Sequence, residues 1–549
     1  MSFDRPSAST LEKALSSAAR QQFSDPDALV HYHELLLFLR AYPHNSRLVT
    51  LTEKELAFFS QRIQALAANE VDISSIETPE ISGIAGTSVT DTFSYCIVRW
   101  LARLYPGEVS LYWEWFEDDY RLAETWPRFM PLLEEDAFVE ANVPYRKWLR
   151  AAAGPSDKAL IWLVNQFESL SKTDQKKAEL FDSQKLYVQW SPPYRATRTG
   201  MRLPVSKVFY HREPLIQRRD VSLKGELDKP SPKLERVSTR EGEAVLDMAR
   251  AASTIRYREL YGFTHGDANR VFKTNLGRGV DVFVTGLPPN RRLPLRAYHA
   301  AMIFKNGVPV GYFEGLSLFE RMEGGFNLYY GFRDGETAWL YARTLNIFRH
   351  LLGVTAFSLD PYQIGYENEE GIASGALWFY RKLGFRPTDP RIMKLLETEE
   401  KKIKARSTYR TSARTLRKLA VAPMIYEHDK SRPADWDEFQ VRNIGLAVQR
   451  RMAAEFDGDA QRIRATSVKE LIAWLGNEPS QWRETELPAL NDFAVTLSLV
   501  KDLRRWSQSE LDALATIIHA KAGADESTYL KLMQNHSRLR NALIRLGSE

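Results

Sequence analysis

Cysteine is almost absent from this chain: Cys96 is the single one among 549 residues. One cysteine cannot form an intrachain disulfide, which excludes a small disulfide-stabilised secreted fold and is typical of proteins of the reducing cytoplasm. The neighbours Phe93, Ile97 and Trp100 are apolar. We therefore interpret Cys96 as a small buried side chain rather than as a reactive thiol.

Long hydrophobic runs are also lacking. No apolar stretch approaches the ~20 residues that a membrane helix needs, and the first residues, MSFDRP, contain no apolar segment of the kind that a secretory signal has. These two absences predict a protein of the cytoplasm without a membrane span.

Several catalytic patterns are missing as well. The sequence has no Walker-type Gly-Lys-Ser/Thr, no nucleophile-elbow context around its serines and no Cys/His spacing typical of a metal site. We predict no bound metal. The net charge of +5 is too small for a chain of this length to indicate nucleic-acid binding by itself.

The length and composition indicate an ordinary globular protein with more than one core. Hydrophobic residues make up 44% and charged residues 26% of the chain, and single cores stop growing near ~250–300 residues. We predict a multidomain α+β protein in which mostly helical regions flank a central mixed α/β domain. The predicted parts are a helical region 1–183, a strand-containing basic connector and linker 184–232, the central domain 233–392 and a helical region 393–549.

The central domain shows a clear order of elements. Apolar runs at Tyr298–Phe304 and Pro309–Phe319 flank Asn306-Gly307, a pair that tolerates the positive φ of a tight hairpin turn. We expect a second turn around Glu323-Gly324-Gly325 and a third strand over Phe326–Phe332. This meander is followed by a helix capped by Asp334 and ended by Gly353, by a strand over Val354–Leu359, and by a helix over Ala376–Leu383.

The end of this domain resembles a known family. The segment 376–385, ALWFYRKLGF, is similar to the C-terminal signature of the GNAT (GCN5-related N-acetyltransferase) superfamily, in which an Ala is followed four residues later by Tyr and then by x-Lys-Leu-Gly-Phe. The preceding elements have the matching order, and the resemblance covers roughly Leu234 to Pro387.

The resemblance implies an acyl-CoA-dependent N-acyltransferase with acetyl-CoA or another acyl-CoA as cosubstrate. In the family, the cofactor pyrophosphate binds to the loop between the fourth strand and the helix that follows it. It binds there because a helix N-terminus presents free N–H groups and the positive end of the helix dipole. Here that loop is 333–338, so the candidate cofactor-binding residues are Arg333, Gly335, Thr337 and Ala338, with Asn368 in the following long segment. Glu336 replaces the first glycine of the family pattern. Either Gly335 takes over that role or the loop no longer holds CoA in the usual way.

The resemblance also implies two catalytic roles. Tyr380, the Tyr of the signature, would protonate the departing thiolate, and the alternative is a helix tyrosine packed against the sheet. A glutamate would accept the proton of the attacking amine. Glu314 interrupts an otherwise apolar strand and is our candidate, while Glu320 and Glu323 lie near the end of that strand. Surface charge is the alternative for each.

Two other functions remain open. The first is a non-catalytic protein that keeps the same fold as a binding or scaffolding module. The segment Lys401–Lys418 contains eight Lys or Arg and no acid, which is compatible with RNA or another phosphate partner and equally with a solvated helix face. The acceptor is an unspecified small-molecule or macromolecular amine, and we expect the helical flanks to select it or to mediate oligomerisation.

Overall fold

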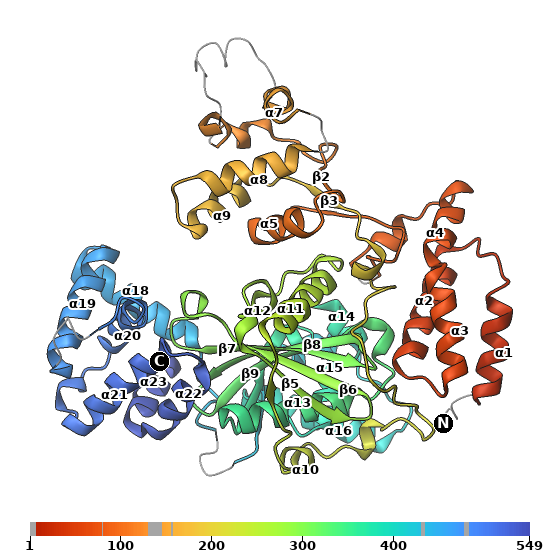
Figure 1. The fold of residues 1–549 in the computed structure, drawn as a ribbon. Coiled ribbons are helices and arrows are strands. Elements are labelled where there is room, and N and C mark those ends of the chain that lie inside the picture. Colours follow the sequence, from red (N-terminus) through yellow and green to blue (C-terminus); the bar gives the residue numbers. More distant parts are fainter. Residues whose placement is uncertain are drawn as a thin grey trace. The chain divides into compact units, whose positions relative to one another are not determined.

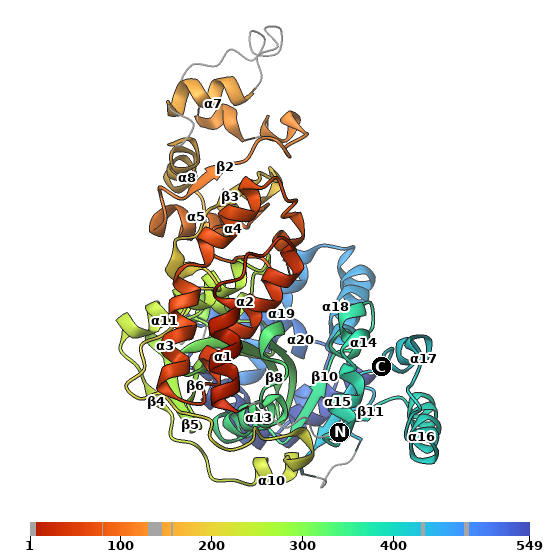
Figure 2. The same cartoon turned by 90° about the vertical axis from the view of Figure 1, so that its right-hand side faces the viewer.

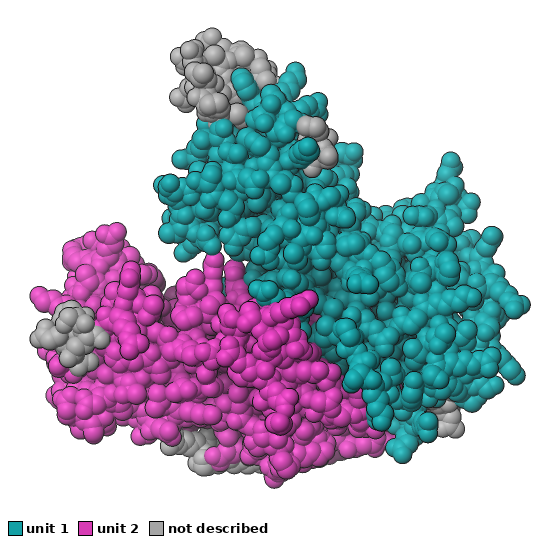
Figure 3. All heavy atoms as spheres, viewed as in Figure 1, with its two compact units in different colours: residues 1–214, 243–264, 304–309 teal, residues 215–242, 265–303, 310–549 magenta. Residues whose placement is uncertain are grey.

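The structure is a computed structural model that describes residues 7–79, 81–123, 125–129, 145–154, 158–429, 434–476 and 482–549. The chain forms two compact units, coloured separately in Figure 3. Unit 1 contains residues 1–214, 243–264 and 304–309, and unit 2 contains residues 215–242, 265–303 and 310–549. Among the described residues, no helix is long and apolar enough to cross a membrane.

Unit 1 is mainly helical, with one small sheet. The strands β1 (Val89–Asp91), β3 (Val188–Trp190) and β2 (Val109–Leu111) pair antiparallel in that order. The helices are α1 (Ala8–Ala18), α2 (Pro26–Ala41), α3 (Ser46–Ala57), α4 (Phe59–Ala68), α5 (Tyr95–Leu104), α7 (Tyr145–Ala153), α8 (Ala159–Ser169), α9 (Asp174–Ser183), most of α11 (Thr239–Thr254) and α12 (Tyr261–Thr264). The helical character predicted for 1–183 is present, and β1 and β2 are additions that their short length hid from the sequence pattern.

A nine-stranded mixed sheet forms the core of unit 2, in the order β11-β12-β10-β9-β8-β7-β6-β5-β4 (Figure 1). The strands are β4 (Glu235–Arg236), β5 (Val271–Gly277), β6 (Val280–Thr285), β7 (Ala297–Lys305), β8 (Val308–Leu318), β9 (Arg321–Leu328), β10 (Ala356–Leu359), β11 (Arg386–Pro387) and β12 (Met424–Glu427). Strands β8 and β9 pair antiparallel, whereas β9 and β10 pair parallel. The mixed α and β character predicted for the chain is thereby confirmed.

The expected turn around Glu323-Gly324-Gly325 is wrong. The chain turns earlier, at Phe319-Glu320, where Phe319 has φ +52°, and the two glycines lie inside β9. The physical reason is packing: a Cβ built on Gly324 would lie 2.7 Å from Cζ of Phe313 on β8. The glycine therefore makes room for an aromatic ring of the neighbouring strand.

The helix α13 (Thr337–Leu352) covers one face of this sheet. Its Phe348 ring lies 5.1 Å from that of Phe313, and its Tyr341 ring lies 5.1 Å from that of Phe326 on β9. Gly353 ends the helix in the left-handed conformation at φ +73°, as predicted. The N-cap is Glu336 rather than Asp334, and no side chain caps the helix.

Further helices of unit 2 follow in chain order. They are α10 (Leu223–Leu227), α14 (Glu369–Ala373), α15 (Ala376–Lys382), α16 (Pro390–Ala405), α17 (Ala413–Leu419), α18 (Val441–Phe456), α19 (Ala460–Leu475), α20 (Leu487–Leu497), α21 (Gln508–Lys521), α22 (Glu526–Asn535) and α23 (Ser537–Ser548). Helix α16 contacts both α17 and β11 (Figure 2).

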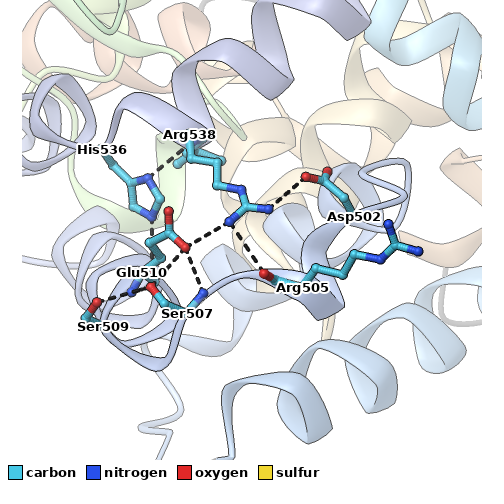
Figure 4. A network of polar contacts seen from close by, with 8 residues as sticks. Asp502, Arg505, Ser507, Ser509, Glu510, His536 and Arg538 are labelled. Carbon is cyan, nitrogen blue, oxygen red and sulfur yellow. Dashed lines mark hydrogen bonds and ion pairs between the residues drawn. The ribbon is translucent and has the colours of Figure 1, made fainter.

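A polar network joins the ends of the last helices (Figure 4). Arg538 of α23 donates to Glu510 of α21 at 3.0 Å and to Asp502 at 3.0 Å. Nδ1 of His536 accepts from the Leu539 N–H, so its Nε2 carries the proton and donates to the Glu510 carbonyl oxygen at 3.0 Å. The contact with Arg538 lowers the pKa of Asp502. Arg538 therefore links the first turn of α23, on which it lies, to the first turn of α21.

The turn at Asn306-Gly307 has the predicted form, with φ +49° and +81°, and both residues belong to unit 1. The Asn306 side chain is 1% exposed. Its Nδ2 donates to the carbonyl oxygens of Ala41 and Phe209, and its Oδ1 accepts from the Phe209 N–H at 2.8 Å. Asn306, which the sequence pattern places in a turn, therefore also forms several side-chain hydrogen bonds within unit 1.

We expect Asn306→Ala to lower the free energy of unfolding by about 3 kcal/mol, because it leaves the Phe209 N–H buried without an acceptor and places a Cβ without a polar group at positive φ. Thermal and denaturant unfolding measure the change. Glu70→Ala is the control, since Glu70 is exposed and has φ +55°. Equal losses in the two variants would show that backbone strain, and not the buried hydrogen bonds, accounts for the effect.

Candidate functional site

The candidate base Glu314 lies in the middle of β8 and faces away from α13. Side chains alternate between the faces of a strand, and the preceding residue, Phe313, packs against α13. Glu314 is paired across the strands with Gly325 of β9. Because glycine has no side chain, no side chain of β9 lies directly opposite the carboxylate.

The environment of Glu314 is unusual for a carboxylate. Burial raises the pKa of Glu314 to about 7, and no ion pair with Glu314 is found among the described residues. The hydroxyl of Tyr298 on β7 donates a hydrogen bond to Glu314 Oε1. A carboxyl group that titrates near neutral pH within a sheet is a group that can accept and release a proton under physiological conditions.

Other polar groups lie on this face of the sheet. A Cβ built on Gly325 would lie 3.5 Å from Nε2 of Gln363, so the Gln363 amide occupies the space that the glycine leaves. Tyr312, two residues before Glu314, accepts a hydrogen bond from Nδ2 of Asn327 at 3.3 Å. The face therefore combines the buried carboxyl group of Glu314 with two phenols and amide groups.

The two other carboxylates considered from the sequence have structural partners. Arg540 of α23 donates to both carboxylate oxygens of Glu320, at 2.9 Å from its Nε to each. Glu323 lies 3.4 Å from a guanidinium nitrogen of Arg296. Of the three glutamates, Glu314 alone combines burial with a raised pKa, so it remains the candidate base.

The parallel pairing beside this face is short. Strand β10 pairs with β9 at Ala356–Arg321, Phe357–Met322 and Ser358–Glu323. Beyond Glu323, within the described residues, β9 no longer pairs with β10, while it continues to Leu328 along β8. The two parallel strands thus pair at one end and not at the other, next to Gly325 and Gln363.

Glu336, which replaces a glycine of the family pattern, is buried and paired. Its side chain has 0% exposure, and its Oε1 lies 2.5 Å from Nη2 of Arg278. Nε of Arg278 donates to the same oxygen at 2.7 Å, and the Ile216 N–H donates to it at 3.3 Å. The charge is therefore neutralised inside unit 2 instead of being presented at the start of α13.

The remaining loop residues surround the N-terminus of α13. Within the described part of the chain, the backbone N–H groups of Thr337 and Ala338 have no hydrogen-bond acceptor, as expected in a first helical turn. The Thr337 hydroxyl donates to the Arg333 carbonyl oxygen at 2.7 Å, and the Gly335 N–H donates to Phe332. Arg333 forms an ion pair of 2.5 Å with Glu370, in which both side chains are partly exposed.

Tyr380 lies in an aromatic cluster on the other side of the sheet from Glu314. Its ring is 5.5 Å from that of Tyr341 on α13 and 5.8 Å from that of Phe385. Burial raises the pKa of Tyr380 above its ordinary value. The structure does not bring Tyr380 and Glu314 to one face, which favours the packing interpretation of Tyr380.

Asn368 is the N-cap of α14. Its Oδ1 accepts from the Gly371 N–H at 3.0 Å, and its Nδ2 donates to the Tyr362 carbonyl oxygen at 2.9 Å. Both ends of the amide are engaged in local backbone contacts, which is the usual role of Asn at this position.

The basic segment Lys401–Lys418 covers the end of α16, a connection and α17. All eight of its Lys and Arg residues are exposed. Lys402 pairs with Glu399, and Arg417 pairs with Glu369. The others show no acidic partner among the described residues; they are Lys401, Lys404, Arg406, Arg410, Arg414 and Lys418.

Two residues of the candidate site were not found from the sequence: Tyr298 and Arg278. Tyr298 lies within a fully buried strand, where no alternation marks its face. Arg278 follows a strand that the apolar pattern did not reveal. The segment that ends at Gln363 is marked in the sequence by its position directly after an apolar strand.

Among the described residues, no group of three or more His, Cys, Asp or Glu side chains is arranged to hold a metal ion. Comparison of the chain with protein-family models, curated proteins and solved structures gives no match.

We expect Arg278→Met to lower the free energy of unfolding by roughly 3–5 kcal/mol, because it leaves the buried Glu336 carboxylate without its cation. The double variant Arg278→Met/Glu336→Gln should regain much of this loss, since the buried charge is then removed. Denaturant unfolding of the two variants and of Glu336→Gln gives the coupling free energy. A loss that persists unchanged in the double variant would contradict the assignment.

Proposed function

We propose that the chain is an acyl-CoA-dependent N-acyltransferase in which Glu314 is the general base. The observation that carries the proposal is the buried Glu314 carboxyl group, whose pKa is raised to about 7 and which lies opposite Gly325, beyond the last residue of β9 that pairs with β10. The resemblance of segment 376–385 to the GNAT signature supplies the reaction class.

The proposed chemistry needs a base at neutral pH. An amine is a nucleophile only without its extra proton, so a group must remove a proton as the nitrogen attacks the thioester carbonyl carbon. The C–N bond forms, the C–S bond breaks, and the departing thiolate takes up a proton from solvent to give the free thiol. A carboxylate with an ordinary pKa near ~4.3 binds protons weakly at pH 7, whereas one with a pKa of about 7 accepts a proton readily and releases it again. Tyr298, which donates a hydrogen bond to Glu314, holds the carboxylate in place.

The residues around α13 fit an anionic cosubstrate. The unpaired N–H groups of Thr337 and Ala338 and the positive end of the helix dipole attract a pyrophosphate. Glu336 does not oppose this binding, because its charge is buried and paired with Arg278. Arg333 is held by a partly exposed ion pair with Glu370, a type of pair that contributes little stability and that a phosphate can replace.

The alternative is a non-catalytic module with the same fold. The position of Tyr380, away from Glu314 and within an aromatic cluster, favours it, while the raised pKa of Glu314 favours the enzyme. A further candidate, association with RNA, is supported by the six exposed basic residues of the segment 401–418 that have no acidic partner in the described structure. Binding that weakens steeply with salt is the property that identifies such a contact.

Binding of acetyl-CoA or CoA to the full chain tests the first part of the proposal. At a ligand concentration of 100 times Kd, the free energy of unfolding rises by ~2.7 kcal/mol, which thermal unfolding and calorimetry detect. Arg333→Gln should weaken binding several-fold, and Lys382→Gln, which removes one exposed charge elsewhere, should not. If millimolar acetyl-CoA and CoA leave the melting temperature unchanged, the enzyme proposal is wrong.

Glu314→Gln tests the base. With acetyl-CoA and a set of primary amines, release of the free thiol should slow by about 10²- to 10⁴-fold, while the affinity for CoA is retained. In the parent chain kcat/KM, calculated per unprotonated amine, should rise with pH through about 7, because the base acts only when Glu314 is ionised, and this rise should vanish in the variant. Glu323→Gln, on the same face but paired with Arg296, is the control. An unchanged rate in Glu314→Gln would remove this residue from the mechanism.

A further inference from the structure

Unit 2 contains a cavity of about 240 Å³ that is separate from the Glu314 face. Its apolar walls come from β5, β6, the segment that follows β6, and the end of α13; they are Phe272, Val284, Leu287 and Leu351. The start of α22 closes another side with Asp525, Glu526 and Ser527. His299 of β7 also lines the cavity, and its ring lies 6.4 Å from that of Phe348. The cavity is therefore on the α13 face, opposite to Glu314.

His299 is the polar group at the inner wall. The residue is 5% exposed, and its Nδ1 is buried with no hydrogen-bond partner among the described residues. Burial lowers the pKa of His299, so the ring is neutral at pH 7 and has one donor and one acceptor nitrogen. Leaving such a group without partners is costly in a folded core. The cavity beside the ring provides the space for a molecule that supplies them.

Two groups of opposite charge line the same cavity. No hydrogen bond or ion pair of the Arg270 guanidinium is found within the described residues, although Arg270 lies close enough to Asp525 to help lower the pKa of that carboxyl group. Oδ1 of Asp525 accepts from the Ser527 N–H at 2.8 Å. Burial, the largest single influence, raises the pKa of Asp525, but the hydrogen bonds from Ser527 and Thr528 and the charge of Arg270 together outweigh it, so the pKa is lowered and Asp525 stays ionised.

The wall that carries Asp525 is held in place by contacts of Arg292 and Lys521. Arg292 donates to the carbonyl oxygens of Gly523 at 2.8 Å and Ala524 at 3.3 Å. Lys521, which is 3% exposed, forms a 2.5 Å ion pair with Glu526 and donates to the Arg296 carbonyl oxygen at 3.0 Å. The charge of Glu526 is therefore neutralised by Lys521. The charged side chains of the cavity wall that can pair with a ligand are Arg270 and Asp525.

We propose that this cavity binds a small molecule that carries both a carboxylate and an amine on an apolar body, such as an apolar amino acid. Arg270 pairs with the carboxylate, Asp525 with the ammonium group, and the walls with the apolar body. A cavity of about 150 Å³ lined by apolar side chains accommodates benzene, so one of about 240 Å³ accommodates an aromatic ring with a short charged end. His299 offers a hydrogen bond to one of the polar groups.

Calorimetry on the full chain with three probes tests this proposal: L-phenylalanine, 3-phenylpropanoate, which lacks the amine, and phenethylamine, which lacks the carboxylate. L-Phenylalanine should bind, and each analogue should bind at least ~10-fold more weakly, because one of the two charged groups then lacks its partner. The proposal is overturned if L-phenylalanine and L-leucine at 10 mM give neither heat of binding nor a thermal shift. This concentration is ~10 times the weakest Kd of interest.

Variants locate the binding. Arg270→Gln should weaken binding of L-phenylalanine about 10-fold or more and leave that of phenethylamine unchanged. His299→Phe keeps an aromatic ring in place and removes both nitrogens, so it should weaken binding of L-phenylalanine while the melting temperature is kept. Lys531→Gln, an exposed charge on α22, is the control. Binding that survives both Arg270→Gln and His299→Phe would place the ligand elsewhere and would overturn the proposal, whereas acetyl-CoA binding is measured separately and does not depend on it.

Discussion

The short parallel pairing between β9 and β10 is the constraint on which the candidate site depends. Three residue pairs join the strands at one end, and β9 then continues along β8 alone. Where this pairing stops, the segment that follows β10 leaves the sheet, and its Gln363 amide lies near Gly325, which pairs with Glu314. The polar side chains of β8 and of that segment therefore lie near one another at the end of the parallel pairing, and active sites often lie at the ends of strands.

Two buried glutamates show how the surroundings decide the role of the same side chain. Glu336 has a guanidinium partner at 2.5 Å and a backbone N–H donor, so its charge is compensated and serves the structure. Glu314 has a phenol as its partner and no cation among the described residues, so burial raises its pKa to about 7. An uncompensated carboxyl group lowers stability as the pH rises from its ordinary pKa of ~4.3 to its raised pKa of about 7, because over this range the unfolded chain has released a proton that the folded chain still holds. A group that weakens the fold in this way is a candidate for function.

Two neighbouring residues of β7 place their side chains in chemically different environments. Tyr298 points to the face of Glu314, and His299 points to the face of α13 and the cavity. The alternation of a strand thereby separates the proposed catalytic face from the proposed small-molecule site. The two glycines of β9 also make room on opposite faces of the sheet. Gly324 accommodates the Phe313 ring on one face, and Gly325 accommodates the Gln363 amide on the other.

The sequence by itself determined the local features: the Asn306-Gly307 turn, the end of α13 at Gly353, the order of meander, helix, strand and helix, and Glu314 as a charge inside an apolar strand. These follow from backbone preferences and periodicity, which act over a few residues. The tertiary structure alone decided that β9 begins before its two glycines, that Arg278 neutralises Glu336, and that Tyr380 and Glu314 lie on opposite faces. Such outcomes depend on which side chains from distant segments meet, and no local pattern in the chain encodes the charge or the space that a distant residue supplies.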